Sequence, residues 1–122
     1  MEKMKKLTPE QHRVLVERGT ELPFTGKLLL NKKNGTYMCV GCGSPLFYSS
    51  AKYDSGCGWP SFFEAVKESV DMKKDDSHGT SRIEVTCKKC GGHLGHVFDD
   101  GTKPTGKRFC INSAALEFEE KK

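Results

Sequence analysis

Two Cys-x-x-Cys pairs constrain the fold of this chain more than any other feature of its sequence. The pairs occur in the runs Cys39-Val40-Gly41-Cys42-Gly43 and Cys87-Lys88-Lys89-Cys90-Gly91. Glycine in these runs lets the backbone turn tightly, so that the two sulfurs of a pair converge. The 44 residues between Cys42 and Cys87 exceed the ~15–20 residues of a compact zinc ribbon. The pairs are therefore expected to clamp distant segments of one domain.

Four thiolates at this spacing favour a zinc site. Such a set completes a tetrahedral shell around Zn2+, and a closed shell is structural because no position stays open for a substrate. Two redox-active Cys-x-x-Cys motifs are the alternative interpretation. The glycines and the pairing of the motifs favour zinc, so one structural Zn2+ per chain and no organic cofactor are expected. The predicted ligands are Cys39, Cys42, Cys87 and Cys90.

The length and composition place the chain among small, β-rich domains. Its 122 residues predict a single domain spanning residues 1–122, with one modest core. Only 35% of the residues are hydrophobic, and 13 glycines and 5 prolines predict many turns. A core of this size benefits from a metal that ties its segments together.

Charge and hydropathy argue against several classes of protein. The net charge of +4 comes from basic and acidic residues mixed along the chain, which is not the pattern of a nucleic-acid-binding arm. No apolar run approaches the ~20 residues of a membrane span. The N-terminal lysines are followed by no apolar signal region, so a cytoplasmic protein without nucleic-acid or membrane partners is expected. Thiols in that compartment are kept reduced.

Local patterns predict mainly strands and turns. Thr8, Pro9 and Gln11 form the capping pattern of a helix that Gly19 would end. The dipeptide Asn34-Gly35 is typical of a hairpin turn. Pro60 suits the first turn of a short helix over residues 60–66. The predicted strands cover residues 27–31, 36–40, 44–48, 72–76 and 81–86, the last two as a second hairpin.

Two cysteines remain outside the paired motifs, and Cys110 is the first of them. Read as a strand, its surroundings place Phe109 and Ile111 on one face and Arg108, Cys110 and Asn112 on the other. A fixed cation beside a thiol favours the thiolate, which is the nucleophilic form. The pattern therefore proposes Cys110 as a nucleophile. A buried structural cysteine is the alternative, since a free cysteine packs as a small hydrophobe.

Cys57 is the second unpaired thiol, and it lies in the run Gly56-Cys57-Gly58-Trp59-Pro60. Glycines on both sides make its loop compliant, as a thiol that approaches another thiol requires. A nucleophilic thiol and a partner thiol are the minimum for a thiol–disulfide cycle. Trp59 is the only tryptophan, and an exposed indole is a good wall for a methyl or thioether group. Packing of the loop against the core by Trp59 is the alternative.

His93 and His96 follow the second cysteine pair in a glycine-rich stretch. The glycines argue against a helix, so a loop or an irregular strand is expected. Four cysteines already fill a zinc shell, so neither histidine is needed as a ligand. Histidine is the usual general acid near neutral pH, and these two come just before the Cys110 strand. The sequence does not rank one above the other.

Three of these motifs together resemble the methionine-R-sulfoxide reductases of the B type. The similarity covers nearly the whole chain and includes the four paired cysteines and the Arg-x-Glu-Val sequence at 82–85. The resemblance implies an all-β fold with two antiparallel sheets packed together, short peripheral helices and a structural four-cysteine zinc site. The matching motifs are G-C-G-W-P-S-F at 56–62, H-L-G-H-V-F-D-D-G at 93–101 and R-F-C-I-N-S-A-A-L at 108–116.

The resemblance also implies an oxidoreductase that repairs oxidised methionine in proteins or peptides. Cys110 would attack the sulfoxide and become a sulfenic acid, and Cys57 would convert that acid to a disulfide that thioredoxin reduces. Trp59 would hold the substrate methyl group. His93, His96 and Asn112 would bind or protonate the sulfoxide oxygen, with Arg108 supporting the nucleophile. A monomer is expected.

Two departures from the family pattern and two rival functions accompany this expectation. Thr102 stands where proline is usual, and Phe109 where many relatives have tyrosine. A zinc-stapled binding module would explain the paired cysteines but not the two further thiols, the tryptophan and the histidines. A general thiol oxidoreductase would need one Cys-x-x-Cys pair without metal.

Overall fold

The computed structural model describes residues 7–75, 82–101, 103 and 105–121. One short α-helix, two 3-10 helices and nine strands occur in these ranges. In chain order they are α1 (Pro9–Leu15), β1 (Gly35–Cys39), β2 (Pro45–Tyr48), η1 (Ser49–Ala51), β3 (Lys52–Tyr53), β4 (Ser61–Phe62), β5 (Val70–Asp75), β6 (Arg82–Cys87), β7 (His93–Phe98), β8 (Arg108–Ile111), η2 (Ser113–Ala115) and β9 (Leu116–Glu120).

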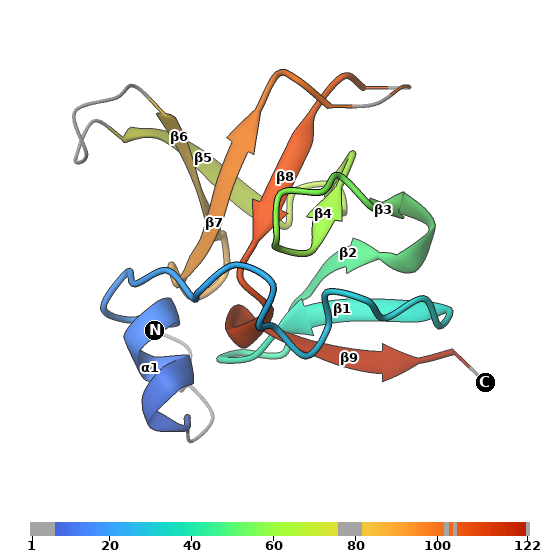
Figure 1. The fold of residues 1–122 in the computed structure, drawn as a ribbon. Helices are drawn as coiled ribbons and strands as arrows, with labels where there is room; N and C mark the ends of the chain where they lie inside the picture. Colours follow the sequence, from blue (N-terminus) through green and yellow to red (C-terminus); the bar gives the residue numbers. More distant parts are fainter. Residues whose placement is uncertain (1–6, 76–81, 102, 104, 122) are drawn as a thin grey trace.

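The strands form two antiparallel sheets, which confirms the expected all-β class. One sheet has the strand order β2-β1-β9, and the other has the order β3-β4-β8-β7-β6-β5 (Figure 1). The chain passes from the larger sheet to the smaller one after β8, through η2 into β9. None of the helices in the described ranges is long and apolar enough to cross a membrane.

Aromatic side chains from both sheets meet in the core. The Phe47 ring, from the smaller sheet, stacks on the Phe62 ring of the larger sheet with centroids 4.3 Å apart. Tyr37 meets Phe62 edge to face at 5.1 Å, and Phe109 lies 5.8 Å from Phe47. Such pairs add to the free energy gained by burying the rings. Phe109 therefore faces the core, as the alternation in its strand predicts.

The N-terminal helix begins where its capping pattern predicts. The Thr8 side chain accepts a hydrogen bond from the Gln11 N–H, and the Gln11 side chain accepts one from the Thr8 N–H. These two bonds satisfy donors that the first turn would otherwise leave free. The helix ends at Leu15, four residues before Gly19, and buries Val14 and Leu15. This packing holds a helix that is too short to be stable alone.

Three local expectations were wrong. Residues 27–31 form turns rather than a strand: the Leu29 N–H bonds to the Gly26 carbonyl and the Asn31 N–H to the Leu28 carbonyl. No hairpin therefore forms at Asn34-Gly35, and β1 pairs instead with β2 and β9. The predicted helix over residues 60–66 is also absent, because residues 61–62 pair with β3 and β8 as β4.

The other strand predictions were confirmed. Residues 45–48 form β2, and the second hairpin exists as the antiparallel pair β5 and β6. Its predicted tip at residues 76–81, like Thr102, lies outside the described residues. Pairing of β6 with β7, and of β7 with β8, places the histidine segment beside the Cys110 strand.

Candidate active site

Cys110 lies near the middle of the larger sheet, on strand β8. Its Cα is paired with that of Ser61 on β4 and with that of His96 on β7. Residues directly opposite each other on neighbouring strands point to the same face of a sheet. Ser61, Cys110 and His96 therefore form a row of polar side chains across three strands. Phe109 and Ile111 point the other way into the core.

The two thiols outside the paired motifs lie next to each other. The Sγ atoms of Cys57 and Cys110 are 2.8 Å apart, although 53 residues separate them in the chain. A disulfide bond is about 2.05 Å long, so forming one requires a movement of less than about 1 Å. Positive φ angles of 77° at Gly56 and 97° at Gly58 give the loop its turn toward Cys110, and glycine adopts them without strain.

The pair shares its charge unevenly. A hydrogen bond with Cys110 is the largest cause that lowers the pKa of the Cys57 thiol to about 4, and the Ser55 and Ser61 hydroxyls also lower it. The same bond and burial raise the pKa of Cys110, and the Arg108 guanidinium only partly opposes this. Both shifts favour the negative charge on Cys57 and the proton on Cys110 in the reduced pair. The sequence predicts that the Arg108 cation favours a Cys110 thiolate, but the contact with Cys57 has the larger effect on this pKa.

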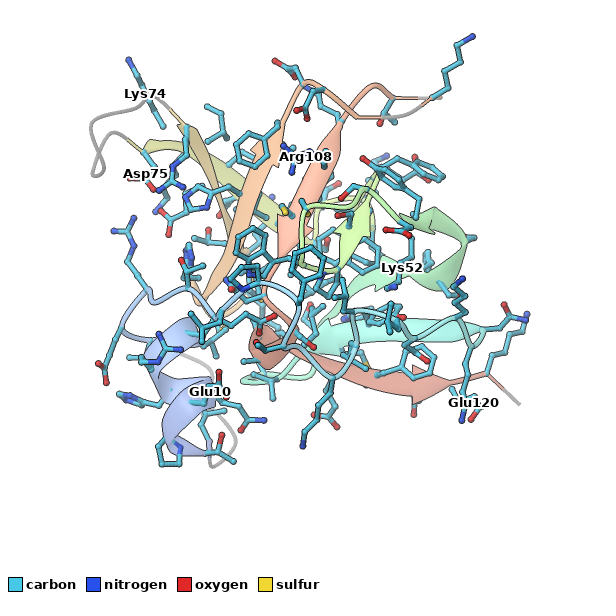
Figure 2. The ribbon with its side chains drawn as sticks, viewed as in Figure 1. Glu10, Lys52, Lys74, Asp75, Arg108 and Glu120 are labelled. Carbon is cyan, nitrogen blue, oxygen red and sulfur yellow. The ribbon has the colours of Figure 1, made fainter. Side chains whose placement is uncertain are left out.

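Arg108 is nevertheless held against the thiol. Its Nη1 lies 3.5 Å from the Cys110 Sγ, and its guanidinium carbon lies 4.4 Å from the centre of the Phe98 ring. Asp100 accepts two further bonds, from Nε at 2.8 Å and from Nη2 at 3.2 Å. Figure 2 shows Arg108 beside β7 and β8, the strands that carry Phe98 and Cys110. A guanidinium fixed by a two-pronged carboxylate contact presents its charge in one direction.

His93 and His96 lie on β7, an irregular strand as predicted. In a regular strand, residues three apart point to opposite faces. A bulge changes this: Val85 pairs with Gly95 but Thr86 pairs with His93, so Leu94 is an extra residue. Bulges re-aim side chains, and the two imidazole rings lie 5.5 Å apart.

Each histidine has a carboxylate partner, Glu84 on the neighbouring strand β6 or Asp75 on β5, one strand further away. The His93 Nδ1 lies 2.7 Å from Glu84 Oε2, and the His96 Nε2 lies 2.8 Å from Asp75 Oδ2 (Asp75 is labelled in Figure 2). Glu84 also accepts a 2.8 Å bond from Arg18. The His93 Nε2 is buried and has no hydrogen-bond partner among the described residues. That nitrogen is therefore free to meet a ligand.

Trp59 and Asn112 are tied to backbone atoms. Trp59 is half-buried, as one of the sequence interpretations proposed, and its Nε1 donates to the Glu21 carbonyl at 3.0 Å. Asn112 lies just beyond β8 and is 3% exposed. Its Oδ1 accepts from the Glu21 N–H, and its Nδ2 donates to the Leu94 carbonyl. In this conformation the Asn112 carboxamide therefore holds two chain segments together.

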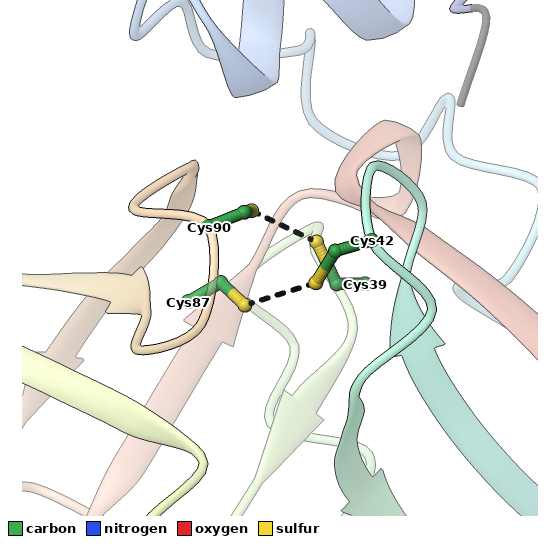
Figure 3. A group of neighbouring side chains, drawn as sticks. All are labelled: Cys39, Cys42, Cys87 and Cys90. Atoms are coloured by element: carbon green, nitrogen blue, oxygen red, sulfur yellow. Dashed lines mark hydrogen bonds between the residues drawn. The ribbon is translucent and has the colours of Figure 1, made fainter. Parts of the chain in front are cut away.

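The four paired cysteines gather at one place, far apart in the chain but close in space (Figure 3). All four Sγ atoms lie within 4.8 Å of one another, and the Cys39–Cys90 and Cys42–Cys87 Sγ distances are both 3.6 Å. Zn–S bonds of about 2.3 Å in a tetrahedron require sulfurs about 3.8 Å apart. The donor set therefore fits a metal ion, and thiolate chemistry favours zinc.

Comparison with known proteins identifies the family. The SelR domain matches residues 7–120, which is nearly the whole chain. The chain belongs to the SelR family. It is 59% identical over 117 residues to a protein of Leptospira interrogans named peptide methionine sulfoxide reductase MsrB, with 95% of this chain and 89% of that protein covered. Proteins of the same name from Shigella dysenteriae and Escherichia coli are each 57% identical over 115 residues, with 93% of this chain and 84% of each relative covered.

These relatives confirm the resemblance seen in the sequence motifs of this SelR protein. The sequence reasoning did not find the carboxylates Asp75, Glu84 and Asp100 or the buried Glu21. Glu84 lies in the Arg-x-Glu-Val sequence that the resemblance includes, and Asp100 lies in the motif that ends at Gly101. No sequence motif marks Asp75 or Glu21 as a site residue. Strand pairing brings Asp75 to His96, and folding of the segment after α1 brings Glu21 to Trp59.

Replacement of Glu84 by glutamine is expected to lower the pKa of His93 further. Burial is the largest cause that lowers this pKa, and the hydrogen bond and charge of Glu84 oppose it, whereas His96 and Arg18 lower it. Glutamine removes the opposing charge, so the neutral imidazole becomes the favoured form down to a lower pH. NMR titration of His93 in both proteins measures the shift. A higher pKa in Glu84→Gln would contradict this account.

Proposed function

We propose that this chain is a peptide-methionine (R)-S-oxide reductase formed by one domain over residues 1–122. The 2.8 Å approach of Cys57 to Cys110 is the observation that carries the proposal, since it supplies the thiol pair that sulfoxide reduction consumes. Membership of the SelR family and relatives named peptide methionine sulfoxide reductase MsrB support it. The reaction converts methionine-R-sulfoxide in proteins or peptides to methionine.

The first step is attack by Cys110 on the sulfoxide sulfur. For this step the proton of Cys110 passes to Cys57 over the 2.8 Å contact, and Arg108, at 3.5 Å, stabilises the resulting Cys110 thiolate. Two electrons pass from the Cys110 sulfur to the substrate sulfur, and the substrate oxygen becomes the oxygen of a Cys110 sulfenic acid. Methionine leaves as a thioether. The sulfenic acid is the reversible first stage of cysteine oxidation.

The sulfoxide oxygen needs a proton during this step. His93 and His96 bind that oxygen and one of them provides the proton, each oriented by its carboxylate partner, Glu84 or Asp75. Trp59 forms the wall for the substrate methyl group, because an indole face favours contact with a thioether methyl. Asn112 contributes by fixing the backbone beside the nucleophile. The preference for the R diastereomer follows from the family resemblance.

The second step regenerates the enzyme. The Cys57 sulfur attacks the sulfenic acid of Cys110, and the proton that Cys57 accepted in the first step passes to the departing oxygen, which gives a Cys57–Cys110 disulfide and water. A dithiol protein, thioredoxin, then reduces the disulfide and supplies the two electrons of the cycle. The low pKa of Cys57 also makes it the better leaving group when the disulfide is reduced.

A structural zinc ion completes the proposal. The ligands are Cys39, Cys42, Cys87 and Cys90, whose sulfurs fit a tetrahedral shell. A bound Zn2+ would tie the end of β1 and the β1–β2 turn to the end of β6 and the β6–β7 turn, and the chemistry at Cys110 does not pass through it. Zinc thiolates and a reduced thiol pair suit the cytoplasm. A monomer suffices, since every site residue named above comes from one chain.

Turnover of the separated diastereomers of a methionine sulfoxide peptide, with dithiothreitol as the reductant, tests the proposed function. The expected result is activity on the R form and a rate at least about 100-fold lower on the S form, because a site built around three fixed contacts rejects the mirror arrangement. Activity on neither form, in folded protein that contains zinc, would overturn the proposal.

Replacement of Cys57 by serine is expected to stop recycling but not the first turnover. Without Cys57 the sulfenic acid has no partner thiol, so turnover with thioredoxin should fall by a factor on the order of 100 or more. In a single-turnover experiment without reductant, the variant should still form one methionine per chain. Quantifying methionine by chromatography, with and without thioredoxin, separates the two steps. Full thioredoxin-dependent turnover by Cys57→Ser would exclude Cys57 as the resolving residue.

A further inference from the structure

Glu21 bonds two residues of the site at once. Its N–H donates to the Asn112 Oδ1 and its carbonyl accepts from the Trp59 Nε1, both at 3.0 Å. Trp59 belongs to the Cys57 loop, and Asn112 follows the Cys110 strand. Figure 1 shows the segment after α1 crossing in front of the two sheets, where it meets both. Glu21 thus links the loop of one thiol to the strand of the other.

The carboxylate of Glu21 is anchored away from solvent. The residue is 3% exposed, and its Oε1 accepts from the Ala114 N–H at 2.9 Å, in the first turn of η2. The Oε2 is buried without a hydrogen-bond partner among the described residues. A Cβ added at Gly26 would lie 2.6 Å from this Oε2, so only glycine leaves room for the carboxylate there. Burial raises the pKa of Glu21, and a buried carboxyl group of this kind is costly to keep unless its contacts stabilise the fold around it.

The residues after Glu21 bond to the same two segments, the Cys57 loop and the start of η2. The Phe24 N–H donates to the Gly58 carbonyl at 2.7 Å, and the Leu28 N–H donates to the Ser113 hydroxyl at 2.8 Å. Phe24 has a φ of 67°, which is strained for a bulky side chain. Backbone strain of this kind persists only where surrounding contacts enforce it. We call residues 21–28 the strap, because it is fastened to the Cys57 loop on one side and to the start of η2 on the other.

We propose that Glu21 is a positioning residue that fixes the Trp59 indole relative to Cys110. Its carboxylate fastens the strap to η2, and its carbonyl, placed by that anchor, holds the indole N–H. This inference rests on the proposed function, in which Trp59 is the wall for the substrate methyl group. Loss of the carboxylate would leave the indole free to rotate away, while the Cys57, Cys110 and Arg108 contacts stay in place. Substrate binding would then weaken more than the chemical step.

Trp59 is the only tryptophan, so its fluorescence reports directly on the indole. In Glu21→Ala we expect the emission to shift to longer wavelength and acrylamide quenching to increase, because the indole loses its fixed, half-buried place. The KM for the R-sulfoxide peptide should rise by on the order of tenfold, as loss of a hydrogen bond to a charged group implies, with kcat changed much less. Glu21→Gln keeps an acceptor for the Ala114 N–H and should restore most of both properties.

Glu17→Ala is the matched control, because Glu17 lies four residues earlier with a side chain that is 61% exposed. It should leave the emission and KM at wild-type values. Unchanged emission and quenching in folded Glu21→Ala would overturn the inference, whatever the activity. If Glu21→Ala does not fold, Glu21→Asp, which shortens the carboxylate by one methylene, should show the same changes at smaller size, and its failure to do so would also overturn it. Failure of the proposed function is distinguishable, since wild type would then lack turnover while the fluorescence comparison still stands.

Discussion

Replacement of Cys110 by serine is expected to abolish methionine sulfoxide reduction while the protein stays folded. A serine hydroxyl is only slightly smaller than a cysteine thiol. Cys110 is 9% exposed, so the substitution should change the packing around β8 only slightly. A serine hydroxyl is not ionised near neutral pH and cannot form a sulfenic acid, so the loss should exceed about 1,000-fold. Turnover of the R-sulfoxide peptide with dithiothreitol measures it.

Two controls make the Cys110→Ser result informative. Zinc content and the thermal unfolding midpoint should match those of wild type, which shows that the loss is chemical rather than structural. Ser61→Ala removes a hydroxyl that contacts Cys57 and leaves both thiols in place, so turnover should fall far less than in Cys110→Ser. Substantial turnover by Cys110→Ser would mean that another group attacks the sulfoxide.

Removal of the zinc ligands should have the largest effect on stability. Cys87 is fully buried, so Cys87→Ser is expected to lose the metal and to leave the remaining thiolates close together without a counter-charge. Structural zinc contributes on the order of 10 kcal/mol to the folding of small domains. The unfolding midpoint should therefore fall by more than about 10 °C, with the protein unfolded at 37 °C in the extreme case. Metal analysis and circular dichroism on heating test this.

The matched control for the metal site is Cys57→Ser, which removes a thiol from the other cluster. It should retain one zinc per chain and an unfolding midpoint close to that of wild type. A Cys87→Ser protein that unfolds at the wild-type temperature would show that the four cysteines do not stabilise the fold through a metal.

Features set by neighbouring residues could be predicted from the sequence. The capping box at Thr8 and Gln11 depends on residues three apart, and the structure confirms both of its bonds. Alternation within residues 108–111 placed Phe109 and Ile111 in the core. The spacing of the cysteine pairs predicted a four-sulfur cluster because only four of the six thiols share one pattern.

Features set by long-range pairing could not be predicted in this way. The dipeptide Asn34-Gly35 suggested a hairpin, but residues 27–31 form turns and β1 pairs on its two sides with β2 and β9. Pro60 suited a helix, yet pairing of Ser61 with Cys110 draws the following residues into the larger sheet. Strand pairing of this kind overrides local propensity.

The carboxylates that orient the site illustrate the same limit. Asp75 reaches His96 from a strand that is two positions away in the sheet, and the Glu21 carboxylate reaches the Ala114 N–H from a segment without regular structure. The charge of the thiol pair is another example, because the pKa of Cys110 depends on Cys57, 53 residues away, more than on the adjacent Arg108. Only the folded arrangement shows which neighbour has the larger effect.

A single turnover without reductant tests the central proposal most directly. Fully reduced protein is mixed with one equivalent of the R-sulfoxide peptide, and the products are analysed by chromatography and by mass spectrometry of proteolytic fragments. The account predicts one methionine per chain, a protein lighter by two hydrogen atoms, and a disulfide that joins Cys57 to Cys110 while the four other cysteines keep their zinc. Methionine formed without that disulfide, or a disulfide among Cys39, Cys42, Cys87 and Cys90, would contradict it.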